Sequence, residues 1–451
     1  MGAFKSYDIR GVWEKDFDAT TVYRIGRCLP KLLSADRVLI GRDARSSSPV
    51  IFDALTRGIT EAGADVDSMG LTTTPMTYYF TGKKGYACAV MITASHNPKE
   101  YNGLKISRKG ALPVGSDSGL KTLEAMIAEE LPPAAAVPGK INEVNFHDEY
   151  IEFYRQQLPS INGLKVAVDC SNGMGALFVR PLFGEAVDCI YEEIDGTFPN
   201  HAPNPLEPEA TLALREKVKA GGYDIGVIFD GDADRVMFVD ERGEFVRPDI
   251  ITGILAEYYL EKEPGKPVLC DIRTSRGVTE YVEKLGGEPH LWKVGHAFAK
   301  VKLRELGAIV GGELAGHYYF RDFFCCDSAF LCAMLVLGVV AKVKREGRSF
   351  SDLLKAIDPY ANTGECNYTI EEKDAAIDAV IAAAKAEFGN PATFLDFDGV
   401  RCEWQTWWFN IRKSNTEPYL RLVAEAQTEA ELAERKAFIE KVLEAFIRKG
   451  N

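Results

Sequence analysis

One theme recurs three times along this chain: a short apolar segment, a turn rich in glycine or polar residues, and then an amphipathic helix. The apolar segments are "RVLIG" at 37–41, "KVAVDC" at 165–170 and "KPVLCDI" at 266–272. The helix after the first segment opens with Ser48 and Pro49, a pair that suits a helix start. Strands that alternate with helices are typical of βα units, so the pattern predicts an α/β fold with mixed or parallel sheets.

The length of 451 residues is too great for one ordinary hydrophobic core and suggests about three or four domains. After residue 360 the pattern changes to a long alanine-rich helix, several strands and a final charged helix. Joints near residues 160, 250 and 360 divide the chain. We expect α/β domains at 1–155, 156–252 and 253–360, and a C-terminal α+β domain at 361–451.

The composition narrows the range of partners. A formal net charge of -13 argues against a general affinity for nucleic acid or for anionic membrane surfaces. The N-terminal segment has no apolar signal core, and the apolar run Ala329–Ala341 is too short to span a bilayer. The ten cysteines form no Cys-x-x-Cys pair, which favours core thiols in a reducing compartment. We therefore expect a cytoplasmic protein in which the run at 329–341 forms a buried helix.

A polar stretch, "ITASHNPKEYNGLK" from Ile92 to Lys105, follows the apolar run "YACAVM", which predicts a buried strand. An ordinary loop would explain the change, because Asn, Pro and Gly favour turns throughout proteins. The alternative is that Ser95 is held at the end of a strand to take part in chemistry.

An acidic motif, "FDGDADR", follows the apolar strand "DIGVIF". Asp230, Asp232 and Asp234 are two residues apart, a spacing that in an extended segment points all three carboxylates to one side. Such a set favours a hard divalent cation, Mg²⁺ first, although an exposed acidic turn has the same spacing. An EF-hand is disfavoured because Arg235 replaces the glycine at the sixth position of that loop.

Three further segments gather groups that bind anions or hydroxyls. In "RKSNTEPYLR" two arginines bracket a Ser-Asn-Thr run, and guanidinium groups suit phosphate. In "GGELAGH" Glu313 and His317 can bond sugar hydroxyls, and "WKVGHAFAK" adds Lys293 and His296. Each segment also fits an ordinary structural role: a capped turn, a strand-to-turn connection and a helix start with surface charge.

The motifs "YDIRG", "TASHNP", "DGDADR", "GGELAGH" and "RKSNTEPYLR" stand in this order from Tyr7 to Arg421. Taken together they resemble the α-D-phosphohexomutases, and the whole chain is similar to the bacterial phosphomannomutase/phosphoglucomutase branch of that family. The resemblance implies four domains around a central cleft, three of a similar mixed-sheet α/β kind and a fourth of α+β type.

The same resemblance implies roles for individual residues. Ser95 would carry a phosphoryl group, and Asp230, Asp232 and Asp234 would hold Mg²⁺ together with an oxygen of that phosphoserine. The residues at the catalytic end would be Tyr7, Arg10, His96, Asn97, Lys105 and Arg235. The residues that meet the sugar would be Lys293, His296, Glu313, Ala315 and His317. The residues that clasp the phosphate that is not reacting would be Arg412, Ser414, Asn415, Thr416 and Arg421.

The implied reaction interconverts hexose 1-phosphate and hexose 6-phosphate through the phosphoserine and a hexose 1,6-bisphosphate intermediate. The first expected substrate pair is mannose 1-phosphate and mannose 6-phosphate. Lys105 and His317 are both candidates for proton transfer to and from the sugar hydroxyls. One departure concerns the sugar: phosphomannomutases commonly have Glu-Met-Ser where this chain has Glu313, Leu314 and Ala315. The hydroxyl that would contact the sugar is therefore missing.

Several alternatives stay open at this point. The nearest is a phosphoglucomutase or a dual-specificity mutase on the same scaffold. A non-catalytic sugar-phosphate-binding protein would keep the phosphate clamp without turnover, and a metal-dependent phosphatase would release inorganic phosphate. The expected partner is a small phosphosugar, with neither nucleic acid nor membrane, and the protein is expected to be a monomer or a homodimer.

Overall fold

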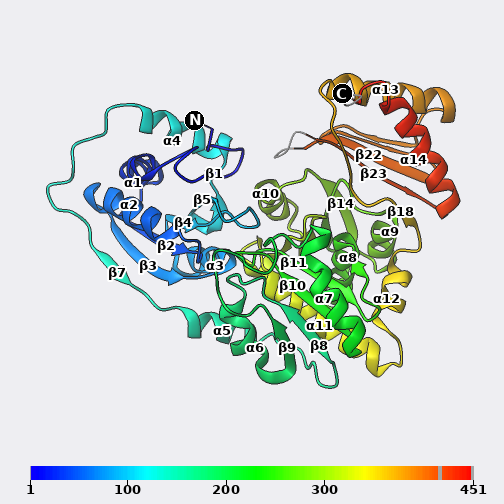
Figure 1. Cartoon of the computed structure of the whole chain (residues 1–451), viewed down its shortest axis with the longest axis horizontal. Coiled ribbons are helices and arrows are strands. Elements are labelled where there is room, and N and C mark those ends of the chain that lie inside the picture. The colour runs from blue at the N-terminus through cyan, green and yellow to red at the C-terminus, as the bar shows by residue number, and fades with distance from the viewer. Residues whose placement is uncertain (1, 415–418, 448–451) are drawn as a thin grey trace.

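The computed structural model describes residues 2–414 and 419–447 of the chain and contains four β-sheets with helices packed against them (Figure 1). The sheets follow one another along the sequence and use residues 9–143, 166–246, 267–327 and 361–426. We call each sheet with its helices a unit and number the units from one to four. The first three sheets are mixed and the fourth is antiparallel, which confirms the predicted α/β and α+β fold classes.

Unit one has seven strands in the order β1-β5-β4-β2-β3-β7, with β6 paired to β5. Strands β2, β3 and β4 are parallel, and β5 runs antiparallel to β4, so the chain makes a hairpin there. The strands are β1 Ile9–Val12, β2 Arg37–Arg42, β3 Asp65–Leu71, β4 Cys88–Ile92, β5 Tyr101–Arg108, β6 Leu112–Pro113 and β7 Ile141–Glu143. The helices are α1 Ala19–Leu33, α2 Ser48–Glu61, α3 Thr74–Lys84 and α4 Leu120–Ala128.

Unit two has five strands in the order β12-β11-β10-β8-β9, and the helix α5 His147–Arg155 leads into it. Its antiparallel hairpin joins β10 to β11. The strands are β8 Val166–Asp169, β9 Val187–Ile190, β10 Ile225–Phe229, β11 Val236–Asp240 and β12 Phe245–Val246. The helices are α6 Ala176–Phe183 and α7 Pro208–Gly221.

Unit three also has five strands, in the order β14-β13-β15-β16-β17. The strands are β13 Pro267–Asp271, β14 Glu288–Trp292, β15 Val310–Gly312, β16 Tyr318–Phe320 and β17 Cys326–Asp327. The helices are α8 Pro248–Leu260, α9 Arg276–Lys284, α10 His296–Leu306, α11 Ala329–Arg345 and α12 Phe350–Ile357. Short 3-10 helices in units one to three are η1 Lys109–Ala111, η2 Ser116–Ser118, η3 Gly184–Ala186 and η4 Arg321–Phe323.

Unit four has six strands in the order β18-β23-β22-β21-β20, with β19 paired to β23. The strands are β18 Ala361–Asn362, β19 Cys366–Tyr368, β20 Thr393–Leu395, β21 Val400–Glu403, β22 Trp407–Lys413 and β23 Leu420–Ala426. The helices are α13 Lys373–Phe388 and α14 Glu429–Leu443, and both lie over one face of the sheet (Figure 1).

The apolar cores show which units pack together. One buried cluster runs through units one, two and three and includes Tyr79, Phe229, Phe323 and Phe330. Unit one has a second cluster of its own, and the core of unit four is separate from both. Helix α11 contains the apolar run singled out in the sequence, and its residues from Ala329 to Leu337 are buried, as predicted. No helix among residues 2–414 and 419–447 is long and apolar enough to cross a membrane.

The exact limits of the four domains stay predictions, because some helices serve more than one unit. The predicted joint at residue 252 falls inside helix α8, which is continuous from Pro248 to Leu260 and packs on β15 and α9 of unit three. Helix α11 packs on α8 and α12 and also on β10 and β11 of unit two.

Candidate active site

The Ser95 loop is the turn of the hairpin between β4 and β5. All five residues of β4 are buried, and the chain leaves this strand through Thr93, whose Oγ1 accepts a hydrogen bond from Ser95 N at 2.9 Å. Ser95 has φ +52°, a left-handed conformation that is uncommon for a residue other than glycine. Its Oγ donates to Asp230 Oδ2 at 2.9 Å and lies 3.3 Å from His96 Nδ1. The structure therefore brings the predicted serine and the acidic motif together.

The acidic motif is the turn of the second hairpin, between β10 and β11. The prediction of an extended segment was wrong: Ala233 N bonds to Asp230 O at 3.2 Å, and Ala233 has φ +56°. The three carboxylates still converge, because the turn curls around Asp230, whose Oδ1 accepts hydrogen bonds from the backbone N of Asp234 and Arg235. At most 1% of the surface of Asp230, Asp232 or Asp234 is exposed, so the three carboxylates form a buried cluster and not an exposed acidic turn.

These aspartates fit a hard divalent cation. One oxygen from each lies within 4.8 Å of one from each of the others, and Asp232 Oδ1 and Asp234 Oδ1 are buried without a hydrogen-bond partner among the described residues. Burial, with repulsion from Asp232 and Asp234, raises the pKa of Asp230 well above its usual range. A cation with oxygen ligands would satisfy the unpaired oxygens and relieve the repulsion.

Lys105 on β5 already neutralises part of this charge. Its Nζ lies 2.7 Å from Asp232 Oδ2 and 2.5 Å from Asp234 Oδ2, and Thr74 Oγ1 donates to the same oxygen of Asp232 at 2.5 Å. Burial alone would lower the pKa of Lys105, but Asp232 and Asp234 raise it above its usual value. Lys105 is therefore held as a cation beside the free oxygens.

Two arginines and a neutral histidine complete the catalytic end. Arg10 Nη1 donates to Asn97 Oδ1 at 2.9 Å, so Arg10 touches the Ser95 loop directly. Arg235 Nε donates to His317 Nε2 at 3.0 Å. Burial, followed by the charges of Arg235 and Arg10, lowers the pKa of His96 well below its usual value, so its imidazole is neutral. Positive charge thus gathers around Ser95, where a phosphoryl group would need it.

A second acidic cluster, Asp234 with His317 and Asp327, has a different role from the first. His317 Nδ1 lies 2.7 Å from Asp327 Oδ2, while its Nε2 accepts from Arg235. Lys300 Nζ lies 2.7 Å from Asp327 Oδ1. These close contacts orient His317, and Lys300 balances the charge of Asp327.

The predicted sugar-binding residues lie on loops of unit three next to Tyr7 of unit one. Glu313 Oε1 accepts from Gly295 N at 3.1 Å and from Tyr319 OH at 3.0 Å, and burial raises its pKa. His296 begins helix α10 and is nine-tenths buried, so it is not a surface residue. The centroid of its ring lies 5.2 Å from that of Tyr7, in an edge-on arrangement, and 5.7 Å from that of His317.

Two other predicted sugar-binding positions are half-buried. Lys293 lines a small cavity with Glu313, and its Nζ is 6.0 Å from the ring of Phe298. Ala315 lies in the tight turn before β16, where Gly316 N bonds to Glu313 O at 2.9 Å.

The predicted phosphate clasp lies at the ends of β22 and β23, where Arg412 and Arg421 are directly paired across the strands. Arg412 Nη1 is 3.6 Å from Asp398 Oδ1, and its Nε is buried without a hydrogen-bond partner in the described part of the chain. Arg421 Nη1 is 2.9 Å from Glu365 Oε1. Ser414 follows β22 and is half-buried, whereas Asn415 and Thr416 lie outside the described residues.

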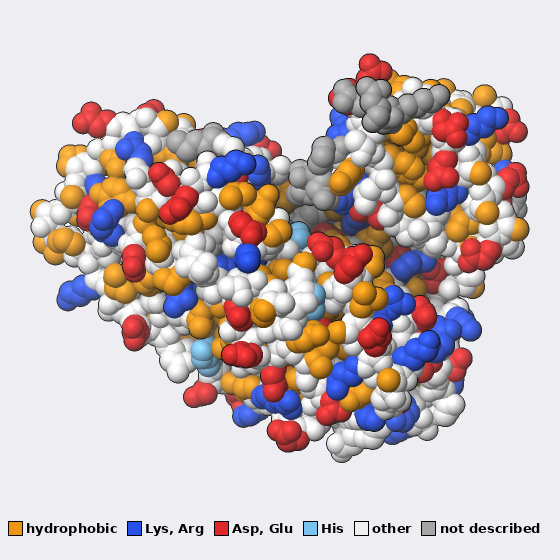
Figure 2. Space-filling view, in the orientation of Figure 1, with side chains coloured by type: hydrophobic (Ala, Val, Ile, Leu, Met, Phe, Trp, Pro, Cys, Tyr) orange, Lys and Arg blue, Asp and Glu red, His pale blue; other side chains and the backbone are white. Residues whose placement is uncertain are grey.

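Electrostatics connects this clasp with the rest of the site. Burial raises the pKa of Tyr7, Glu313 raises it further, and Arg412 acts in the opposite direction. Glu313 of unit three and Arg412 of unit four therefore lie near enough to Tyr7 of unit one to affect its pKa. Figure 2 shows a hollow between unit one and unit four, with histidine and acidic side chains on its floor.

Sequence reasoning missed several residues of the site. Asp327 contacts His317 and is itself paired with Lys300, Thr74 bonds to Asp232, and Arg45 binds the Ser95 loop. Asp327 and Thr74 stand in runs that otherwise predict buried strand or helix. Of these residues, Arg45 is the one whose role the sequence could have indicated, because it follows Asp43 in a polar loop directly after a strand.

Comparison with known proteins matches the whole architecture. Family models described as phosphoglucomutase/phosphomannomutase, alpha/beta/alpha domains I, II and III, match residues 1–133, 148–243 and 247–360. The model for the C-terminal domain of the same family matches residues 365–442.

Relatives and a solved structure agree over nearly the full length. The chain is 36% identical over 445 residues to the phosphohexose mutases of Xanthomonas campestris pv. campestris, with 97% of each chain covered. It is 35% identical over 450 residues to the phosphomannomutase of Escherichia coli K12, again with 97% of each covered. A crystal structure of a phosphoglucomutase/phosphomannomutase family protein from Burkholderia thailandensis superimposes with a TM-score of 0.88 at 31% identity, covering 98% of this chain and 97% of that one. The chain belongs to the phosphoglucomutase/phosphomannomutase family and is an enzyme of the isomerase class.

Proposed function

We propose that this enzyme interconverts the 1-phosphate and the 6-phosphate of a hexose, mannose in the first place, through a phosphorylated Ser95. The observation that carries the proposal is the contact of Ser95 Oγ with Asp230. Three positively charged side chains, Lys105, Arg10 and Arg235, lie near this contact. A serine hydroxyl between a cation-binding acidic cluster and fixed positive charges suits phosphoryl transfer.

In the proposed cycle, the phosphate carried by Ser95 passes to the free hydroxyl of a hexose 1- or 6-phosphate. The bond between phosphorus and Ser95 Oγ breaks while a bond between phosphorus and the sugar oxygen forms. The sugar hydroxyl loses its proton, and Ser95 Oγ gains one. The product is a hexose 1,6-bisphosphate, which reverses its orientation and returns its other phosphate to Ser95. Such transfer depends on positioning and on neutralisation of charge.

The residues that would hold Mg²⁺ are Asp230, Asp232 and Asp234, together with an oxygen of the phosphate on Ser95. When bound, the ion neutralises charge on the transferring phosphoryl group. The unpaired Oδ1 atoms of Asp232 and Asp234 support this ligand set. Lys105 lies on the other oxygens of the same two carboxylates and shields them from each other.

Proton transfer falls to His317 in this proposal. Lys105 has a raised pKa and stays charged, so it is better suited to stabilising phosphate than to accepting a proton. His317 is fixed in orientation by Asp327 and lies among the sugar-binding residues. Arg412, Ser414, Asn415, Thr416 and Arg421 would hold the phosphate that is not reacting, and the unpaired Arg412 Nε supports this assignment.

The function is tested by ³¹P NMR of the purified protein with Mg²⁺ and a trace of glucose 1,6-bisphosphate. Mannose 1-phosphate and glucose 1-phosphate are offered in parallel. Conversion to the 6-phosphates is expected, with mannose 1-phosphate the faster. Release of inorganic phosphate would instead indicate a phosphatase, and binding without conversion would indicate a sugar-phosphate sensor.

A second candidate, a dual-specificity mutase, is favoured by Ala315. This residue stands in the half-buried turn between Glu313 and His317, where a serine hydroxyl would reach the sugar site. Without that hydroxyl, the turn has one group fewer with which to distinguish the sugars.

Replacing Ala315 by serine is expected to raise kcat/KM for mannose 1-phosphate by about 2- to 10-fold, the value of one added neutral hydrogen bond. Initial rates with both sugar phosphates measure the change. The control is Ala386→Ser on the exposed face of α13, which should leave both rates unchanged. If the ratio of mannose to glucose activity stays the same in Ala315→Ser, residue 315 does not contact the sugar.

A further inference from the structure

Arg45 lies behind the Ser95 loop and uses all of its hydrogen-bonding capacity there. Only 1% of its surface is exposed. Its Nε donates to Asp43 Oδ2 at 3.1 Å, and its remaining four contacts go to backbone carbonyl oxygens. These are Pro98 O at 2.6 Å and Tyr101 O at 3.1 Å from Nη1, and Ser95 O at 2.8 Å and Asn97 O at 2.6 Å from Nη2.

This set of contacts matches the chemistry of a guanidinium group and of no other side chain. Arginine has five N–H donors in one rigid plane, and five acceptors converge on Arg45. The chain between Ser95 and Tyr101 turns these four carbonyl groups toward Arg45, and the buried carbonyl of Ser95 needs such a partner. Ser95 itself is in the left-handed conformation, which persists only when the surroundings fix it.

Arg45 is in turn held from two units. Asp43 also accepts from Arg45 N at 3.1 Å and from Ser48 Oγ at 2.6 Å, which fixes the carboxylate within unit one. The ring of Phe198, from unit two, lies over the guanidinium with its centroid 5.0 Å away. Phe198 also packs against Gly231 of the acidic turn. A side chain at position 231 would clash with Ser95 O, so the two turns approach each other closely there.

We infer that Arg45 is the positioning residue that fixes Ser95 Oγ against the acidic cluster. The inference rests on the proposed phosphoserine function. Arg45 touches neither substrate nor the reacting atoms; it acts by holding the carbonyl groups of the loop. Through Phe198, the same guanidinium connects the Ser95 hairpin of unit one with the loop of unit two that packs on the acidic hairpin.

The test is Arg45→Lys, which keeps the charge but replaces the planar five-donor fork by three donors on one atom. The rate at which glucose 1,6-bisphosphate phosphorylates Ser95 and kcat are both expected to fall about 100-fold, the effect of a displacement of about 1 Å at a reacting group. KM for the sugar phosphate is expected to stay within about threefold, because the sugar and phosphate loops are untouched. Rapid-quench labelling and steady-state rates supply the two measurements.

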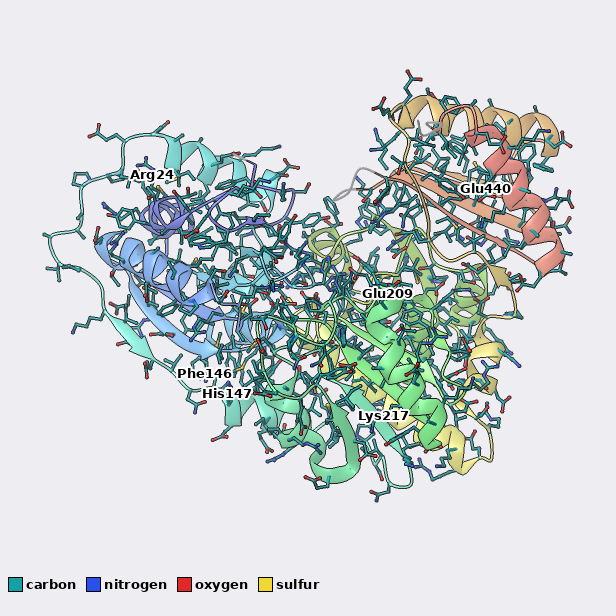
Figure 3. The ribbon with its side chains drawn as sticks, viewed as in Figure 1. Arg24, Phe146, His147, Glu209, Lys217 and Glu440 are labelled. Carbon is teal, nitrogen blue, oxygen red and sulfur yellow. The ribbon has the colours of Figure 1, made fainter. Side chains whose placement is uncertain are left out.

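The matched control is Arg24→Lys. Arg24, on α1, also donates to backbone carbonyls, Ile127 O at 2.6 Å and Glu129 O, but Figure 3 shows it at the outer side of unit one, away from the acidic hairpin. This variant should keep wild-type kcat. In Arg45→Ala, added methylguanidinium should restore phosphorylation and methylammonium should not, a difference that general damage to the fold would not produce.

Each outcome decides between the two proposals. Wild-type labelling and kcat in Arg45→Lys would overturn the role of Arg45 while leaving the mutase intact. A wild-type protein that neither labels Ser95 nor converts hexose phosphates would overturn the proposed function itself. If Arg45→Lys does not fold, Phe198→Leu is the second test, because it removes the ring that covers the Arg45 guanidinium. A lower kcat at unchanged KM then supports the inference, and an unchanged kcat contradicts it.

Discussion

Replacing Ser95 by alanine is expected to reduce turnover by about 10⁴-fold or more, as when a covalent nucleophile is removed. The hydroxyl lies 2.9 Å from Asp230 Oδ2 and is the group that would carry the phosphate through both halves of the cycle. The variant should also lose the phosphoryl label that glucose 1,6-bisphosphate leaves on the wild-type protein. Mass spectrometry of the intact protein measures the label, and a coupled assay measures the turnover.

The fold should survive this change. One hydrogen bond to the buried Asp230 is lost, a cost of about 1–3 kcal/mol, and the backbone bond from Ser95 N to Thr93 remains available. Ser118→Ala is the matched control: this serine is exposed, lies in the same unit and makes only local hydrogen bonds with residues 113–115, so activity and label should both persist. A Ser95→Ala protein that still turned over at the wild-type rate would place the phosphate carrier elsewhere.

The sequence predicted the fold where the signals are local. The strands β2, β8 and β13 are short apolar runs bounded by polar turn residues, and the helices that follow them have an apolar stripe. The long apolar run at 329–341 was identified as a buried helix because it is too short for a membrane span. The predicted joint at position 252 rested on polar residues near 250, and it falls within helix α8, so this limit stays a prediction.

The candidate site was predicted only as far as single motifs reach. Ser95, Asp230, Asp232 and Asp234 stand in turns that directly follow buried strands, so their chemistry is visible in the sequence. The bend at Ala233 was not, because alanine rarely has a positive φ and gives no turn signal.

Positioning residues are harder still. Arg45 contacts carbonyls about fifty positions away, and Asp327 meets a histidine on the other side of a strand. Backbone acceptors carry no sequence signature, and a buried aspartate looks like any other acidic residue until its partners are placed. A single sequence therefore shows the reacting groups better than the groups that hold them in place.

Replacing Asp230 by asparagine is expected to lower turnover by about 10²- to 10³-fold, the usual cost of removing one preplaced group that stabilises charge in the transition state. Asparagine keeps Oδ1, which accepts from the backbone of Asp234 and Arg235, so the turn should hold its shape. What is lost is one negative charge from the cation site and the oxygen that accepts from Ser95 Oγ. Isothermal titration with Mg²⁺ should show weaker binding, and EDTA should abolish the activity of the wild-type protein reversibly.

Although Asp230→Asn lowers turnover, it is expected to stabilise the metal-free protein. The pKa of Asp230 is raised by burial and by Asp232 and Asp234, so its ionised form destabilises the folded state once the pH exceeds the unfolded pKa of an aspartate. At neutral pH and without Mg²⁺, Asp230→Asn should therefore unfold at a higher temperature than wild type, while the further rise that Mg²⁺ gives the wild type should shrink. The exposed Asp117→Asn, in unit one, should change neither quantity, because its carboxylate faces solvent. A variant less stable than wild type without metal, yet equally stabilised by Mg²⁺, would show that the ion binds elsewhere and that Asp230 only shapes the turn.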